Sequence, residues 1–115
     1  MIKAQIFYQE KQQIAQFRIS GHAGYAPAGQ DIVCAAVSFL ATTVVNSIEQ
    51  LTGKAGVVQC EDGFLSYQLP VDLTESEMAT AQIALQMLSI GLKDLKTEYP
   101  KYISIQKLKI KGGAQ

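Results

Sequence analysis

The order in which strand-like and helix-like spacings of apolar residues follow one another restricts the fold of this chain most strongly. Residues 2–9 alternate between apolar and polar side chains, which is typical of a half-buried strand because successive side chains point to opposite faces. Ala15, Phe17 and Ile19 repeat this alternation. Only the polar stretch 10–13 separates the two segments, so we expect an antiparallel hairpin.

Two segments have the three- and four-residue spacing of a helix with one buried face. The first covers residues 32–52, with Asp31 placed to cap its start and Gly53 to end it. The second begins with a capping-box spacing at Thr74-Glu75-Ser76-Glu77 and ends before Pro100. The positions expected to face the core are Val33, Ala36, Val37, Leu40, Val44, Ile48 and Leu51 in the first helix, and Met78, Ala81, Leu85, Leu88, Leu92, Leu95 and Tyr99 in the second.

Three further strands complete the pattern. Residues 57–61 and 64–69 flank Asp62-Gly63, a strong signal for a tight hairpin turn. Residues 102–110 form the last strand, and their apolar phase changes near Gln106, which predicts a bulge or a change of exposed face. The order ββαββαβ predicts an α/β protein of the α+β kind, a two-layer sandwich with two helices on one face of a mainly antiparallel five-stranded sheet. We expect a single domain over residues 1–115.

Charge and composition restrict the partners. Ten acidic residues balance ten basic ones, so no overall field attracts nucleic acid or anionic lipid. The start of the chain lacks a signal-peptide pattern, and no apolar run reaches the roughly twenty residues of a membrane span. We therefore expect a cytoplasmic protein with no membrane partner. Lys107, Lys109 and Lys111 would either contact RNA phosphates or lie in solvent on an edge strand, and we favour the edge strand.

The two cysteines, Cys34 and Cys60, are expected to be free thiols in a reducing compartment. Together with one histidine they do not supply the four ligands of a closed zinc site. Cys60 lies in a strand pattern without a neighbouring histidine, so we expect a small buried side chain. For Cys34, burial and reactivity are both open.

His22 precedes Cys34 by twelve residues, across a loop of small residues. We expect Cys34 in the first turn of the helix, where the helix dipole and a nearby imidazolium would favour its thiolate. The histidine would then act as base and acid while first-turn amides stabilise an oxyanion, as acyl transfer requires. Loop 23–30 has few large side chains to anchor it, so we expect a mobile segment that is either a connector or a lid.

Asp31 and Ser38 each allow two interpretations. Asp31 either caps the helix, which we favour, or orients the imidazole, or does both. Ser38 lies one turn after Cys34 and either contacts its surroundings or bonds to the preceding turn. The glycines before the helix match neither common phosphate-loop pattern.

Gly21-His22-Ala23, Gly29 and Asp31-Ile32-Val33-Cys34-Ala35-Ala36-Val37-Ser38 resemble the signature of the ribosomal-processing cysteine protease Prp family, and the resemblance covers the whole chain. It implies that Cys34 is the nucleophile and His22 its partner, with Gly21, Asp31 and Ser38 as supporting positions. The implied activity is removal of the short N-terminal extension from the precursor of bacterial large-subunit ribosomal protein number twenty-seven. The resemblance also implies a homodimer, a cytoplasmic setting, no cofactor, and a hydrophobic groove under the loop for a substrate cut after an aromatic residue.

Two other functions are compatible with the sequence. One is a non-enzymatic, ribosome-associated module that binds RNA or protein through Lys107, Lys109 and Lys111 and through the aromatic residues Tyr99 and Tyr102, which it requires to be exposed. The other is a thiol hydrolase or transferase for small acyl substrates. The protease interpretation requires no direct contact with nucleic acid.

Overall fold

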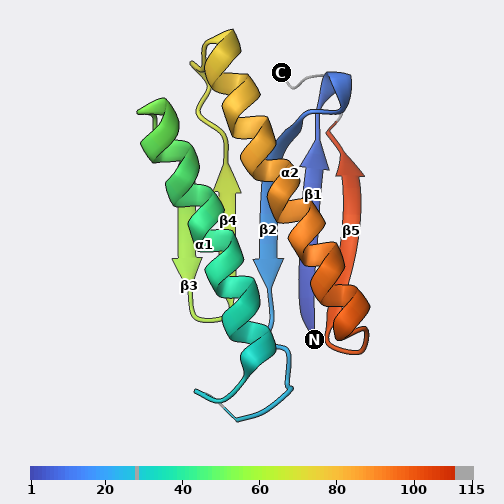
Figure 1. Ribbon diagram of the computed structural model, residues 1–115. Coiled ribbons are helices and arrows are strands. Elements are labelled where there is room, and N and C mark those ends of the chain that lie inside the picture. Colours follow the sequence, from blue (N-terminus) through green and yellow to red (C-terminus); the bar gives the residue numbers. More distant parts are fainter. Residues whose placement is uncertain (28, 111–115) are drawn as a thin grey trace.

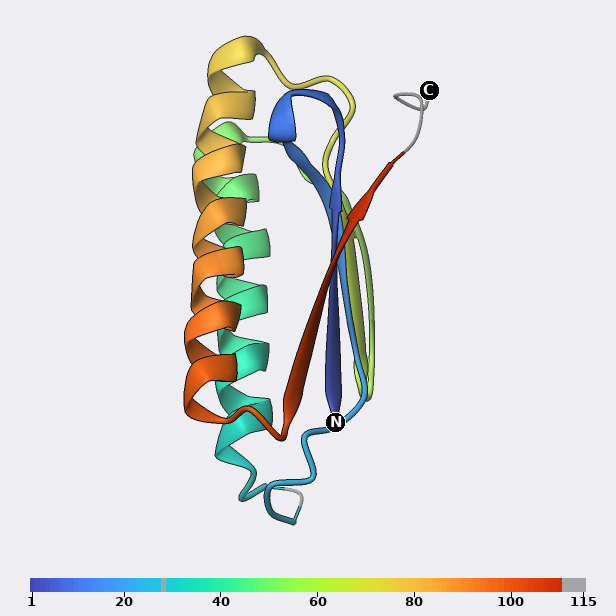
Figure 2. The ribbon, with the colours of Figure 1, turned by 90° about the vertical axis from the view of Figure 1, so that its right-hand side faces the viewer.

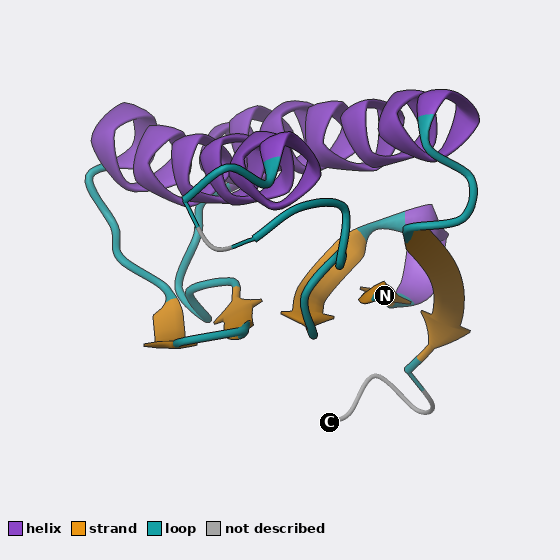
Figure 3. Ribbon diagram, turned by 90° about the horizontal axis from the view of Figure 1, so that it is seen from below, coloured by secondary structure: helices purple, strands orange, loops and turns teal. Residues whose placement is uncertain are grey.

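The computed structural model describes residues 1–27 and 29–110. It confirms the predicted two-layer sandwich, in which both helices lie on the same side of one sheet (Figures 1 and 2). Figure 3 shows the loop between the second strand and the first helix crossing from one layer to the other. In chain order the elements are β1 (Ile2–Tyr8), the short 3-10 helix η1 (Glu10–Gln12), β2 (Ile14–Ser20), α1 (Ile32–Thr52), β3 (Val57–Glu61), β4 (Phe64–Gln68), α2 (Glu75–Glu98) and β5 (Ile103–Lys109).

The sheet has the strand order β3-β4-β2-β1-β5 and is mainly antiparallel. β5 is the exception and pairs with β1 in parallel. Because α2 carries the chain back along the sheet after β4, β5 begins at the same end as β1 and runs in the same direction (Figure 1). The strand order also places the turn between β3 and β4 next to the end of β2.

The caps predicted for both helices are present. The Asp31 side chain accepts a hydrogen bond from the Cys34 backbone N–H, and Gly53 ends α1 in the left-handed conformation. Thr74 and Glu77 form the reciprocal capping box of α2. These local hydrogen bonds explain why the helix bounds agree with the sequence pattern.

The core forms between the helices and the sheet, as the spacing predicts for most positions. A Cβ on Gly91 of α2 would lie 2.7 Å from Cδ2 of Leu40, so the missing side chain permits the two helices to approach closely. Leu51 is an exception, because it is 70% exposed in the last turn of α1. The buried helix residues include Val33, Val37, Ala41, Val44, Val45 and Ile48 of α1 and Ala81, Ala84, Leu85, Leu88 and Leu92 of α2.

The register of β2 differs from the sequence prediction at its start. Pairing with β1 shifts between Phe7 and Tyr8, so that Ile14 rather than Ala15 is buried. The Ile14 N–H donates to the side-chain oxygen of Gln82 at 2.7 Å, and the Gln82 amide donates to the Ile14 carbonyl at 2.8 Å. The buried glutamine thus satisfies both backbone groups of Ile14.

The predicted bulge near Gln106 is wrong, because β5 pairs with β1 without interruption. The alternative, a change of exposed face, describes this strand: Lys107 and Lys109 continue the phase of the buried Ile103 but are exposed. α2 crosses the sheet diagonally and covers the start of β5 rather than its end (Figure 1). Lys111 lies outside the described residues.

One helix of the described chain, α1, is long and apolar enough to cross a membrane by length and composition alone, with a mean hydropathy of 1.7. The sequence expectation that no apolar run has this length is therefore too strict. Six of its side chains are buried in the core of the domain, and a core helix meets the same criterion as a membrane span.

Gln82→Met is expected to destabilise the fold, because it keeps the side-chain volume but leaves both polar backbone groups of Ile14 without partners. The cost is about 3 kcal/mol of unfolding free energy for two buried unsatisfied groups. Urea denaturation measures this difference. Gln86→Met, the same change at an exposed position of α2, is the control, and equal midpoints for the two variants would contradict the assigned role.

Candidate active site

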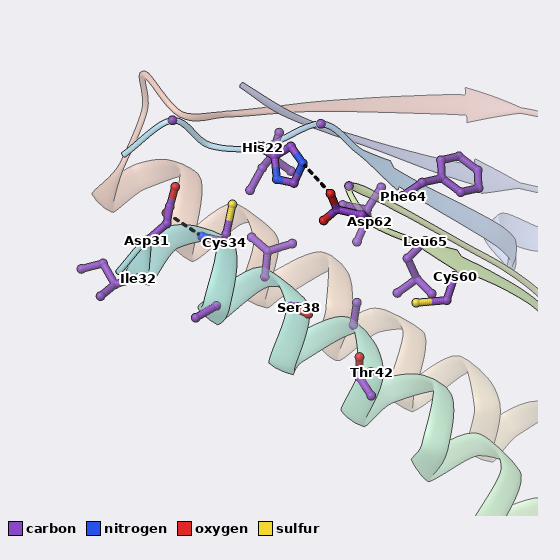
Figure 4. Close-up of a pocket in the computed structure, with 18 of the residues that line it drawn as sticks. His22, Asp31, Ile32, Cys34, Ser38, Thr42, Cys60, Asp62, Phe64 and Leu65 are labelled. Carbon is purple, nitrogen blue, oxygen red and sulfur yellow. Dashed lines mark hydrogen bonds and ion pairs between the residues drawn. The ribbon is translucent and has the colours of Figure 1, made fainter. Parts of the chain in front are cut away.

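His22 and Cys34 line one cleft, as the sequence predicts. His22 follows the end of β2, and Cys34 lies in the first turn of α1. The cleft lies between the start of α1 and the β3–β4 hairpin, and both side chains point into it (Figure 4). Cys34 is half-buried and lines the cleft.

The sulfur of Cys34 accepts a hydrogen bond from the backbone N–H of Ala23 at 3.2 Å. Ala23 follows His22 in sequence and is itself buried, so the contact brings the backbone beside His22 against the thiol. A backbone N–H and the amino-terminal end of α1 therefore meet at this sulfur. The sequence pattern did not reveal this backbone donor.

Asp31 is occupied by backbone amides. One carboxylate oxygen accepts from the Cys34 N–H at 2.9 Å and the other from the Tyr25 N–H at 3.0 Å. The hydrogen bond from Cys34 is the main reason why the pKa of Asp31 lies below its ordinary value. Within residues 1–27 and 29–110, no hydrogen bond or ion pair joins Asp31 to His22. Of the roles left open by the sequence, the structure therefore places Asp31 at the helix cap and at the loop.

Loop 23–30 has an aromatic anchor that the sequence analysis missed. The ring of Tyr25 packs edge-on against Tyr99, with centroids 5.6 Å apart, and against Tyr102, with centroids 5.2 Å apart. Tyr99 and Tyr102 are partly buried at the junction of α2 and β5, so the expectation that they are exposed aromatics is wrong. The contact joins this loop to a part of the chain more than seventy residues away.

Two glycines connect the end of β2 to the β3–β4 turn. The Gly21 N–H donates to the Gly63 carbonyl at 2.9 Å. A side chain on Gly21 would overlap the carbonyl oxygen of Met1, and one on Gly63 would place its Cβ 2.8 Å from Nε2 of His22. Both residues also have positive φ angles, of 90° and 73°. The imidazole of His22 therefore lies directly against the β3–β4 turn.

Asp62, in the same turn, is a further residue of the site that the sequence analysis took only as a turn residue. Its Oδ2 lies 3.9 Å from Nε2 of His22 (Figure 4). Both side chains are largely exposed, 62% for His22 and 98% for Asp62. Since the contact depends on β4 pairing with β2, no local pattern predicts it.

Ser38 and Cys60 line the cleft from opposite walls. Ser38 lies on α1 one turn after Cys34, and among the hydrogen bonds of the described residues none links its hydroxyl to the preceding turn. Cys60 is exposed rather than buried as predicted. The reason is that β3 is the edge strand and all five of its residues are exposed.

The cleft has a volume of about 830 Å³ and mixed walls. Apolar side chains of the strands and of α1 form its floor, and Ser38, Thr42 and Cys60 add small polar or polarisable groups. No group of three histidine, cysteine or acidic side chains suited to a metal occurs in the described part of the chain. The lining residues include Ile2, Ile19, Val37, Ala41 and Leu65.

Gly63→Ala is expected to slow alkylation of Cys34 by iodoacetamide by about threefold or more, because the new methyl group displaces the imidazole. Alanine at a positive φ costs about 1 kcal/mol of stability in itself. Gly53→Ala is a matched control, since Gly53 has a φ of 74° and open space around its Cα. Urea denaturation should show a similar loss of unfolding free energy for the two variants. Alkylation is compared in a Cys60→Ser background, and equal rates for Gly63→Ala and Gly53→Ala would refute the role of Gly63 in positioning the imidazole.

Comparisons with known proteins agree with this arrangement. The family model described as cysteine protease Prp matches residues 1–104. The ribosomal processing cysteine protease Prp of Bacillus subtilis is 28% identical over 101 residues, which cover 86% of this chain and 90% of that protein. The protein of the same name from Staphylococcus aureus is 28% identical over 106 residues, covering 91% of this chain and 97% of the relative.

Solved structures show the same fold. The crystal structure of the Staphylococcus aureus protease Prp with a covalently linked product peptide has a TM-score of 0.82 at 26% identity and covers 93% of this chain and 99% of that one. A crystal structure from Streptococcus mutans has a TM-score of 0.81 at 27% identity and covers 96% of each chain. From the family match over nearly the whole chain, we conclude that this protein belongs to the Prp family of cysteine proteases.

Proposed function

We propose that this enzyme removes the N-terminal extension from the precursor of large-subunit ribosomal protein number twenty-seven, with Cys34 as nucleophile and His22 as its acid–base partner. One observation carries the residue assignment: the Ala23 N–H and the start of α1 both act on the sulfur of Cys34, in the cleft that also holds His22. The printed names of the relatives, ribosomal processing cysteine proteases, support the substrate class.

In this mechanism the thiolate of Cys34 attacks the carbonyl carbon of the scissile peptide bond, and His22 donates its proton to the leaving amine. The resulting thioester is hydrolysed by a water whose proton His22 accepts, and the Cys34 sulfur leaves as the thiolate, which restores the thiolate–imidazolium pair. The Cys34 N–H is engaged by Asp31 and the Ala35 N–H by the Asp31 carbonyl. The donor proposed for the oxyanion is therefore the N–H of Ile32, which begins the helix and lines the cleft.

The cleft supports a peptide substrate. Its floor is apolar and it runs beside the edge strand β3, from Cys34 towards Cys60 (Figure 4). The Staphylococcus aureus relative has been crystallised with a substrate peptide and with a product peptide. An aromatic side chain of the substrate would bury its ring against such a floor. Since the proposed substrate is a ribosomal protein, we propose that the enzyme acts in the cytoplasm.

Incubation of the chain with the unprocessed ribosomal protein is expected to yield the two products of a single cut, identified by mass. Cys34→Ser should lower kcat/KM by about a thousandfold or more, as loss of a nucleophile does. Cys60→Ser is the control and should retain cleavage, because this thiol lies on the far wall of the cleft.

Three outcomes distinguish the alternatives. Cleavage that survives Cys34→Ser would exclude the proposed nucleophile. An intact precursor together with turnover of small thioesters would favour the acyl hydrolase. Salt-sensitive binding of ribosomal RNA by a chain that does not cleave would favour the binding module, although Tyr99 and Tyr102 already contact Tyr25.

We also propose that the enzyme is a homodimer formed through the outer surface of the helices. Phe39 of α1 and Ile83, Met87 and Ile90 of α2 are exposed there, each by 60% or more, and exposed apolar groups favour association. In sedimentation, the chain should have twice its mass of 12.5 kDa, and Met87→Glu should shift it to the monomer. Val71→Glu, at a loop residue that is 97% exposed, is the control. A monomeric wild-type chain would refute the dimer.

A further inference from the structure

The β3–β4 turn offers His22 a carboxylate that no motif of the sequence assigns. We propose that Asp62 is a positioning residue of this active site: it stabilises the protonated imidazole of His22 and keeps Nε2 turned away from Cys34. The proposal rests on the roles of Cys34 and His22 proposed above. It is independent of which protein the enzyme cleaves.

Three carboxylates lie at the cleft, and only Asp62 is placed for this role. Both oxygens of Asp31 accept backbone N–H groups. Glu61 of β3 lies opposite Phe64 of β4, and the neighbouring Cys60 lies opposite Leu65. Leu65 in turn pairs with the buried Ile19 on the helix side of the sheet, so Glu61 belongs to the opposite face.

The distance and direction of the contact define what Asp62 can do. At 3.9 Å, Oδ2 of Asp62 and Nε2 of His22 are too far apart for a hydrogen bond but form an ion pair when the ring is protonated. Because Nε2 points to Asp62, Nδ1 is the ring nitrogen left for Cys34 (Figure 4). The sulfur is also held close to the His22 backbone by the Ala23 N–H.

The backbone holds the exposed pair in place. The Gly21 N–H binds the Gly63 carbonyl, so the residue before His22 is tied to the residue after Asp62. The missing side chain of Gly63 leaves room for the ring against the turn. Since the two side chains extend from tethered backbone segments, less conformational freedom is lost when they pair.

The charge of Asp62 matters at a defined point of the reaction. While Cys34 is a thiolate, His22 carries the proton, and a carboxylate beside Nε2 stabilises that imidazolium. When the proton moves from the ring to the leaving amine, Asp62 stays ionised and takes part in no bond change. Asp62 therefore increases the fraction of enzyme that holds the thiolate–imidazolium pair.

The effect of Asp62 on His22 must be distinguished from the effects of other titratable groups near the ring. They come from α1 and its cap, with Cys34 and Asp31, and from the turn, with Asp62 and Glu61. Met1, which carries the terminal amino group, also lies against Gly21. Glu61→Gln removes one negative charge next to Asp62 without touching His22, so it corrects for the general change of field.

The test uses the full chain with Cys60→Ser, so that Cys34 is the only thiol, and adds Asp62→Asn, Asp62→Glu or Glu61→Gln. His22 is the only histidine, so its ring signals in an NMR spectrum near neutral pH report one side chain. The second readout is the rate of Cys34 alkylation by iodoacetamide at the same pH. Neither measurement needs a substrate.

With Asp62→Asn, the ring signals of His22 are expected to move away from those of the parent, and alkylation near neutral pH to slow about threefold. Asp62→Glu should restore most of both effects. Glu61→Gln should change them clearly less. Ring signals of Asp62→Asn that coincide with those of Glu61→Gln, or equal alkylation rates for the two, would overturn the proposal.

Failure of the proposed function gives a different result. His22→Ala in the same background tests whether the imidazole supports the thiolate at all. If His22→Ala alkylates as fast as its parent, the pairing of Cys34 with His22 is wrong. If His22→Ala slows alkylation and Asp62→Asn does not, only the role of Asp62 is excluded.

Discussion

The site depends on the two hydrogen bonds that the carboxylate of Asp31 accepts from backbone N–H groups. With one oxygen it caps the helix that starts at Ile32, and with the other it holds the Tyr25 N–H of the preceding loop. The Tyr25 N–H is therefore held at the start of α1. Two residues earlier, the Ala23 N–H donates to the sulfur of Cys34. A cap that is common in proteins here also arranges the surroundings of a thiol.

The second half of the site comes from a hairpin far along the chain. β4 pairs with β2, so the turn at Asp62 and Gly63 lies against Gly21 and His22. The thiol and the imidazole thus rest on separate supports: α1 carries one, and the end of β2 with the β3–β4 turn carries the other. Because both supports belong to the packed core or to its hydrogen-bonded sheet, the cleft between them can stay open without disrupting the fold.

The exposed edge of the sheet is consistent with peptide binding. β3 is exposed along its whole length and forms one wall of the cleft that leads from Cys34. An edge strand offers unpaired backbone groups to an extended peptide, and the adjoining apolar floor offers contacts to its side chains. The same exposure explains why Cys60 is accessible, although its strand pattern suggested burial.

Sequence alone determined the elements and their caps, and it placed Cys34 at a helix start, because apolar period and capping residues act within a few positions of the chain. It also revealed the family, because the signature around Cys34 is contiguous. Only the tertiary structure decided that Ile14 replaces Ala15 in the core, that Tyr25 anchors the loop and that Asp62 faces His22. These features depend on strand order and register, which arise from contacts between distant segments and leave no periodic trace in the sequence.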